Sequence, residues 1–287
     1  MRCRHLFVII LALSLSSCRK AREHVSVPTK TAERSLEVED GRDDVVDEDD
    51  TDVDSVIEKG FDYLPKLTIK RPEQILARKG YTLSYNQSTK NANWVAWHLT
   101  KDHTDGPWSR DHIPYMVDED VKGANQKLED WFNTNLPIEH GHMCPAGDNK
   151  WDKDAMVESF YLTNMCPQNS RLNNGGWKYL EERCRGWARH YGDIYIVCGP
   201  IFYNSKYKTI GNGKVGVPDA FYKVVLYIGK KPKALGFIYP NNGESNKIQH
   251  YVTTVDEVER VTGIDFFYNL SDEIEDRVES VSNYNKW

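Results

Sequence analysis

The chain has 287 residues, of which 39% are hydrophobic, 11% aromatic and 28% charged. This composition supplies enough apolar material for a packed core, and it excludes a wholly disordered, a collagen-like and a multi-span membrane protein. The formal net charge of −6, from 37 Lys and Arg against 43 Asp and Glu, argues at first sight against a nucleic-acid partner.

The first 18 residues form a targeting segment. Arg2 and Arg4 precede an apolar run from Leu6 to Leu15, which has the length of a signal-peptide core and is too short to span a bilayer. The run ends in Leu-Ser-Ser-Cys, which resembles the cleavage and acylation site of bacterial lipoproteins. We expect a lipidated Cys18 that anchors the exported protein to a membrane of the bacterial cell envelope, on the periplasmic or outer-membrane side. An ordinary secretory signal is the alternative.

Residues 19–60 are predicted to form an acidic, disordered tether. They contain 14 acidic and 7 basic residues and no aromatic ones, a composition that cannot build a core. A spacer is the favoured interpretation, and a mimic of nucleic acid is the alternative. Residues 61–287 keep 28 basic and 29 acidic residues and are nearly neutral, so the objection to a nucleic-acid partner does not apply to them. We expect one domain over 61–287, with its core over 81–270.

Residue patterns within this domain predict both strands and helices. Alternating and continuous apolar runs predict a hairpin over 81–97, with its turn at 86–93, and strands over 194–198, 221–228 and 234–239. Helical spacing appears over 256–261 and after Asn174, where the apolar face consists of Trp177, Leu180, Cys184 and Trp187. Strands and helices mix without a βαβ rhythm, which indicates the α+β class.

Two segments stand out for their chemistry. The first reads Glu-His-Gly-His over 139–142, and the two histidines of such a strand point to the same face. As a zinc site this pair lacks further ligands at familiar spacing. The second reads Asn-x-x-Pro-Gln from Asn164 and then Asn-x-Gly-x-Trp-x-x-Leu-Glu from Asn173.

Together these blocks resemble the DNA/RNA non-specific endonuclease family, a branch of the ββα-metal (His-Me finger) nucleases. The resemblance implies central antiparallel sheets flanked by helices, with the helix after Asn173 packed against a catalytic hairpin. It also implies a metal-dependent, sugar-non-specific endonuclease that hydrolyses DNA and RNA and binds them through the phosphate backbone. The alternative is a membrane-tethered nucleic-acid-binding protein of the same fold with weak or no catalysis.

The resemblance assigns a role to each of five residues. His142 is expected to be the general base, since a neutral imidazole accepts a proton, and activity should fall as pH drops through about 6 to 7. Asn173 is expected to be the direct ligand of Mg²⁺, or of Mn²⁺ or another divalent cation. Glu181 would hold metal-bound water, Arg185 would stabilise the transition state, and Arg110 would bind substrate.

Each of these assignments has an ordinary structural alternative. Asn173 could be a helix N-cap, and Glu181 with Arg185, four residues apart, could be a surface pair. The chain also has Glu139 and His140 where the family commonly has Asp and Arg. We expect Glu139 to orient the His142 ring and protonated His140 to bind phosphate. The sequence leaves the oligomeric state open.

Four cysteines remain after the signal and Cys18, an even number that suits an exported protein and allows three pairings. Because two lie in the motif blocks and two lie in the motif helix and the strand after it, we expect disulfides between Cys144 and Cys166 and between Cys184 and Cys198. Buried free thiols are the alternative.

Overall fold

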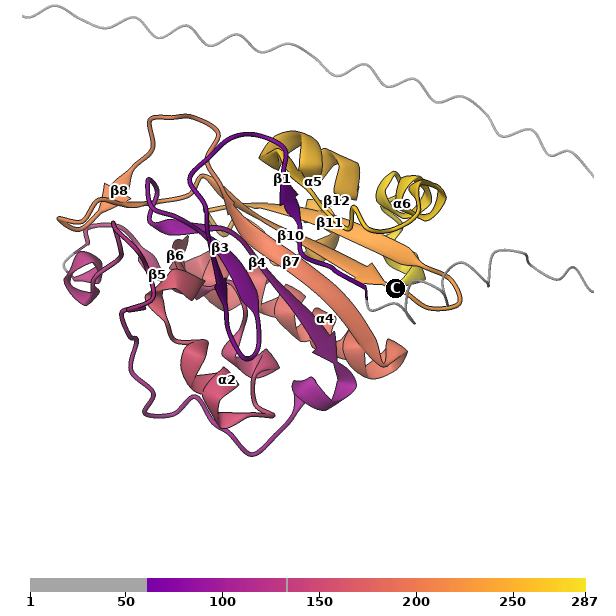
Figure 1. Cartoon of the computed structure of the whole chain (residues 1–287), viewed down its shortest axis with the longest axis horizontal. Coiled ribbons are helices and arrows are strands. Elements are labelled where there is room, and N and C mark those ends of the chain that lie inside the picture. The colour runs from indigo at the N-terminus through magenta and orange to yellow at the C-terminus, as the bar shows by residue number, and fades with distance from the viewer. Residues whose placement is uncertain (1–60, 133) are drawn as a thin grey trace, which may run out of the picture. The chain divides into compact units, whose positions relative to one another are not determined.

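The computed structural model describes residues 61–132 and 134–287, which fold around an antiparallel sheet of seven strands (Figure 1). Its order is β12-β11-β10-β7-β4-β3-β2, and each neighbouring pair is antiparallel. The strands are β2 (Gln74–Ala77), β3 (Thr82–Asn86), β4 (Asn91–Thr100), β7 (Asp193–Ile201), β10 (Ala220–Tyr227), β11 (Lys233–Pro240) and β12 (Val252–Thr253). Three further pairs join β1 (Lys66–Leu67) to β13 (Ile264–Asp265), β5 (Ile138–His142) to β6 (Met165–Asn169) and β8 (Thr209–Ile210) to β9 (Val215–Gly216).

Helices cover both faces of the sheet. They are α2 (Lys153–Glu158), α3 (Ser170–Leu172), a π-helical turn (Asn173–Trp177), α4 (Lys178–Tyr191), α5 (Val255–Thr262) and α6 (Asp272–Glu279). Side chains of successive strand residues alternate between the faces. In β10, Phe221 and Val225 pack in the core beneath α4, whereas Tyr222 and Val224 pack in the core beneath α5 and α6. A strand buried on both faces therefore reads as a continuous apolar run.

The predicted elements are present. The hairpin corresponds to β3 and β4, the three later strands to β7, β10 and β11, and the two helices to α4 and α5. The apolar face of α4 is buried as expected. The α+β class is confirmed by this antiparallel sheet with flanking helices. Beyond the expected core of 81–270, β1 and β2 precede it and α6 follows it.

The expected disulfides are wrong, because all four cysteines are free and buried. The β5–β6 register pairs Cys166 with Gly141, three residues before Cys144, so the two thiols are offset along the hairpin. The Sγ of Cys198 donates a hydrogen bond to the carbonyl of Met143 at 3.3 Å instead of meeting Cys184. The thiols act as small core side chains.

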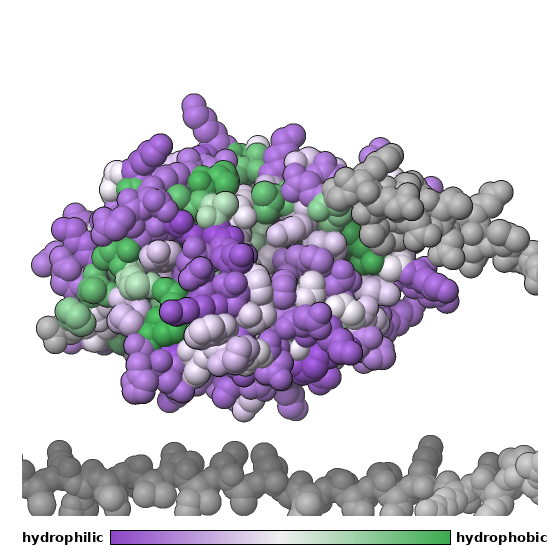
Figure 2. All heavy atoms as spheres, turned by 60° about the horizontal axis from the view of Figure 1, so that its bottom comes forward, coloured by the Kyte–Doolittle hydropathy of each residue, from purple (hydrophilic) through white to green (hydrophobic). Residues whose placement is uncertain are grey.

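No helix within residues 61–132 and 134–287 is long and apolar enough to cross a membrane. The signal peptide, lipidation at Cys18 and the acidic tether all concern residues outside this described part. The face drawn in Figure 2 is mainly hydrophilic, with small separate hydrophobic patches.

Candidate active site

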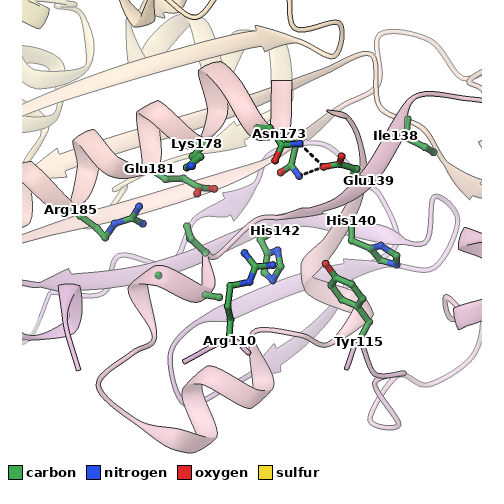
Figure 3. A pocket seen from close by; sticks show the side chains of 14 residues that line it. Arg110, Tyr115, Ile138, Glu139, His140, His142, Asn173, Lys178, Glu181 and Arg185 are labelled. Atoms are coloured by element: carbon green, nitrogen blue, oxygen red, sulfur yellow. Dashed lines mark hydrogen bonds between the residues drawn. The ribbon is translucent and has the colours of Figure 1, made fainter. Parts of the chain in front are cut away.

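A polar pocket of about 560 Å³ lies between α4 and the β5 strand (Figure 3). One wall, at the start of α4, carries Asn173, Asn174, Lys178, Glu181 and Arg185, and the other carries Arg110, Tyr115, Glu139, His140 and His142. The structure thus brings together every site residue named from the sequence outside the cysteines. These residues lie up to 75 positions apart in the chain, and the β5–β6 pairing and the helix that follows it bring them together.

His142 ends β5 and is 8% exposed. The centre of its ring lies 5.1 Å from that of Phe160, and the two rings are nearly perpendicular. Its Nε2 atom has no hydrogen-bond partner. Burial, and then the charges of Arg110 and His140, lower the pKa of His142 to about 3. The imidazole is therefore neutral throughout the neutral pH range, and the expected loss of activity between pH 6 and 7 is not assigned to its protonation.

Glu139 holds the asparagines of the opposite wall. Its Oε2 accepts hydrogen bonds from the Nδ2 atoms of Asn173 and Asn174, both at 2.8 Å (Figure 3). The Asn173 amide is thereby oriented with its nitrogen toward Glu139, which leaves Oδ1 for another partner. The expectation that Glu139 orients the His142 ring is wrong, because its carboxylate is directed to these amides.

Asn173 has helical backbone angles directly after α3 and is not an N-cap. Asn169 has that role, since its side chain accepts a hydrogen bond from the backbone N–H of Arg171 at 2.9 Å. The π-helical turn begins at Asn173 and contains Gly175 in a non-helical conformation. A Cβ atom on Gly175 would lie 2.4 Å from Oδ1 of Asn246, so a larger residue there would displace the Asn246 side chain. Such turns occur frequently at functional sites.

Glu181 faces the pocket from α4. Burial raises its pKa to about 7, with Asp148 adding to this effect while Lys223, Arg185 and Arg110 oppose it. A carboxyl group that titrates near neutrality in a pocket is a candidate functional group.

Arg185 does not pair with Glu181 as an ordinary surface residue would. Its Nη1 donates to Oδ1 of Asp148 at 2.8 Å, and Oδ2 of the same carboxylate accepts a hydrogen bond from Nε1 of Trp97 at 3.1 Å. Asp148 is 1% exposed, so a buried carboxylate anchors the guanidinium. Gly147 leaves room for it, because a Cβ there would lie 2.9 Å from Nη1.

Lys223 does not line the pocket but acts on it from the core, and it was not among the residues expected from the sequence. It is fully buried in β10, and its Nζ lies 4.4 Å from the ring centre of Trp177 and 5.5 Å from that of Trp97. Its charge lowers the pKa of Glu181. A lone lysine within the apolar run 221–228 was the signal that could have found it, because lysine is rarely buried without a reason.

His140 is stacked between two aromatic rings. The ring centres of Tyr115 and Trp131 each lie 3.9 Å from that of His140. The interplanar angles with His140 are 9° for Tyr115 and 17° for Trp131. Burial lowers the pKa of His140 to about 4, although Glu139 opposes this. The expectation that a protonated His140 binds phosphate is therefore wrong at neutral pH. Arg110 remains exposed, with its guanidinium 5.6 Å from the ring centre of Phe160.

The oxygen atoms of this pocket suit a hard divalent cation. Asn173 presents an oriented amide oxygen, and Glu139 and Glu181 present carboxylates beside it, which are the donors that Mg²⁺ and similar ions prefer. Within the described residues, His140 and His142 belong to no group of three His, Cys, Asp or Glu side chains spaced to hold a metal. The zinc interpretation therefore gains no support.

Comparisons with known proteins identify the family and the fold. The family model for DNA/RNA non-specific endonucleases matches residues 64–273. The chain is 34% identical over 207 residues to mitochondrial nuclease EXOG of Mus musculus, covering 66% of this chain and 56% of that protein. It is 36% identical over 211 residues to nuclease C1 of Cunninghamella echinulata var. echinulata, covering 68% and 83%. In the crystal structure of the EndoG/EndoGI complex, one chain matches with a TM-score of 0.64 and 27% identity, covering 68% of this chain and 86% of that one.

Proposed function

The chain belongs to the DNA/RNA non-specific endonuclease family, and from this premise we propose that it cleaves phosphodiester bonds within DNA and RNA. The observation that carries the proposal is the meeting, in one pocket, of a neutral His142, an Asn173 amide oriented by Glu139, and an Arg185 guanidinium anchored on Asp148. The alignment covers only 56% of the mouse relative, so the activity and substrates of this chain are proposals in their own right.

In the proposed reaction, His142 removes a proton from the water molecule that attacks phosphorus. Its neutral imidazole can accept that proton without first losing one. The bond between phosphorus and the 3′ oxygen breaks, and that oxygen leaves. Arg185 and Arg110 donate hydrogen bonds to phosphate oxygens, and a guanidinium does so without losing its charge.

We propose Mg²⁺, with Mn²⁺ or another divalent cation as an alternative, at the amide oxygen of Asn173. Such an ion supplies positive charge that stabilises the phosphate and the departing oxygen. Glu139 fixes the amide that would bind it, and Glu181 accepts hydrogen bonds from water in the same pocket. These residues would hold the ion lightly, since the chain offers few direct ligands.

Nucleic acid would be bound through its backbone and through stacking. Lys178, Arg110 and Arg185 line the pocket with positive charge, which makes binding weaken as salt increases. At position 140 the family commonly has a charged Arg, whereas this chain has a neutral His140 stacked with Tyr115 and Trp131. The three rings form a flat aromatic wall. A wall of this kind favours unpaired bases of any sequence.

We also propose that the protein acts in the bacterial cell envelope as a lipoprotein anchored through Cys18. The apolar run before this cysteine supports the proposal. A Cys18→Ser variant should move from the membrane fraction to the soluble fraction of cells, whereas an unchanged distribution would contradict lipidation.

Cleavage of supercoiled plasmid and of RNA by residues 19–287 tests the activity. With Mg²⁺ the protein should cut both substrates, and a chelator should stop it. His142→Ala should slow cleavage by at least ~10²-fold, the lower range for loss of a general base. His190→Ala, at an exposed histidine of α4, is the matched control and should cut normally. Binding of both substrates without any cutting would instead favour a nucleic-acid-binding protein.

A further inference from the structure

A second group of titratable side chains lies on the face of the sheet opposite the pocket. Helices α5 and α6, side by side in Figure 1, and strand β13 line it with Asp256, Glu259, Asp265, Glu275 and Glu279. One carboxylate oxygen from each of Asp256, Glu259 and Glu279 lies within 4.8 Å of the others. Residues three or four apart share one side of a helix, so both helices direct carboxylates to the same place.

Glu279 distinguishes this cluster from an ordinary acidic surface. The residue is only 3% exposed, and its buried Oε1 atom has no hydrogen-bond partner. It is also the last residue of α6, where the carbonyl end of a helix disfavours a negative charge. A charged carboxylate buried without a partner is strongly unfavourable, so this side chain either holds a proton or is the ligand of a cation.

Two cations of the described residues, Lys66 and Arg260, lie beside the cluster, and neither forms an ion pair with Asp256, Glu259 or Glu279. Arg260, at the edge of the cluster, pairs with Glu257 at 2.6 Å. Lys66 lies opposite Asp265 in the β1–β13 pair.

We propose that Asp256, Glu259 and Glu279 form a structural binding site for Ca²⁺. Calcium takes six to eight oxygen ligands in flexible geometry, and a carboxylate cluster with water completing the shell meets that demand. One oxygen of Glu259 accepts a hydrogen bond from the backbone N–H of Phe266 at 2.7 Å, which holds the side chain and leaves its second oxygen available. The ion would join α5 to α6, and the proposal is independent of the nuclease activity.

Thermal unfolding of the full chain, in chelator and in Ca²⁺, tests the site. At about 100 times the dissociation constant, Ca²⁺ should raise the melting temperature by about 5 to 10 °C. Glu279→Gln keeps the shape of the side chain and removes one of the repelling charges. This variant should melt no lower than the wild type in chelator, and Ca²⁺ should no longer raise its melting temperature. Glu259→Gln should lose the same response.

Two controls locate the effect. Glu273→Gln changes an exposed carboxylate of α6 outside the cluster and should keep the full rise with Ca²⁺. Asn173→Ala alters the polar pocket on the other face and should also keep it. Absence of a rise in the wild type would overturn the proposal. So would a rise that persists in Glu279→Gln and Glu259→Gln, or one that disappears in Asn173→Ala.

Discussion

The Glu139 carboxylate binds the amide nitrogens of Asn173 and Asn174 with the same oxygen atom. An asparagine amide can rotate to present either its oxygen or its nitrogen, and only the oxygen binds a cation. Glu139 fixes this choice from the opposite strand. The longer side chain of Glu, compared with the Asp common in the family, therefore reaches across the pocket to the helix.

Glu139→Ala should weaken the metal affinity of the enzyme. Without its clamp, Asn173 loses the fixed orientation, and loss of such a supporting partner typically reduces metal affinity by about 10 to 100-fold. The Mg²⁺ concentration for half-maximal cleavage should rise by that factor, and high Mg²⁺ should restore most of the rate. Glu182→Ala, at an exposed carboxylate of α4, should leave it unchanged. An unaltered Mg²⁺ dependence in Glu139→Ala would contradict the clamp.

The pH dependence of metal use should follow Glu181 and not His142. Because burial raises the pKa of Glu181 to about 7, this carboxyl group is charged above that pH and takes up a proton below it. A proton at Glu181 opposes a nearby cation, so more Mg²⁺ should be needed at pH 6 than at pH 8. Titrating activity with Mg²⁺ at both pH values measures the difference. Glu181→Gln should abolish this difference. The same Mg²⁺ requirement at both pH values would contradict a role for Glu181 in metal binding.

At the scale of elements, the turn that begins at Asn173 depends on glycine. Gly175→Ala would place a Cβ atom 2.4 Å from Oδ1 of Asn246. The Asn246 side chain is exposed and can move aside, so the free energy of unfolding should fall by no more than about 1 kcal/mol, the low end of the cost of overpacking. Cleavage should fall further than stability alone explains, because Asn173 belongs to the same turn. Urea unfolding and plasmid cleavage measure the two effects.

Gly186→Ala is the matched comparison for that variant. Gly186 lies within α4, and a Cβ atom there meets nothing within 4 Å. Alanine should therefore stabilise the protein by about 0.5 to 1 kcal/mol through helix propensity. If Gly175→Ala proved as stable and as active as Gly186→Ala, the tight turn would not be needed to place Asn173.

Local sequence patterns predicted the elements well and their contacts poorly. Strands β7, β10 and β11 and helix α4 follow from apolar periodicity within single segments, which requires no knowledge of the rest of the chain. The partners of Glu139, by contrast, lie 34 and 35 positions away. Asp148 could not be assigned to Arg185, and Asp256 and Glu259 could not be joined to Glu279, because only tertiary packing brings these side chains together.

Across the whole molecule, one sheet separates two sites of different character. Beneath α4, Lys223 and the core tryptophans support the polar pocket, and beneath α5 and α6 an apolar core carries the carboxylate cluster. The sheet is buried on both faces, so the core and not covalent cross-links holds these layers together. Whether the cysteines are free or cross-linked therefore affects the stability of the entire domain.

Residues 19–287 should behave as a protein with free, protected thiols at positions 144, 166, 184 and 198. Burial raises the pKa of Cys184 and Cys198 to about 12, and the thiol form reacts poorly with disulfide reagents. The native protein should therefore label slowly, and the denatured protein should label at all four positions without reductant. Reductant should leave the melting temperature unchanged. Because loss of a native disulfide typically removes about 2 to 5 kcal/mol, a clear fall in melting temperature with reductant, or unlabelled cysteines after denaturation, would restore the disulfides that the sequence suggested.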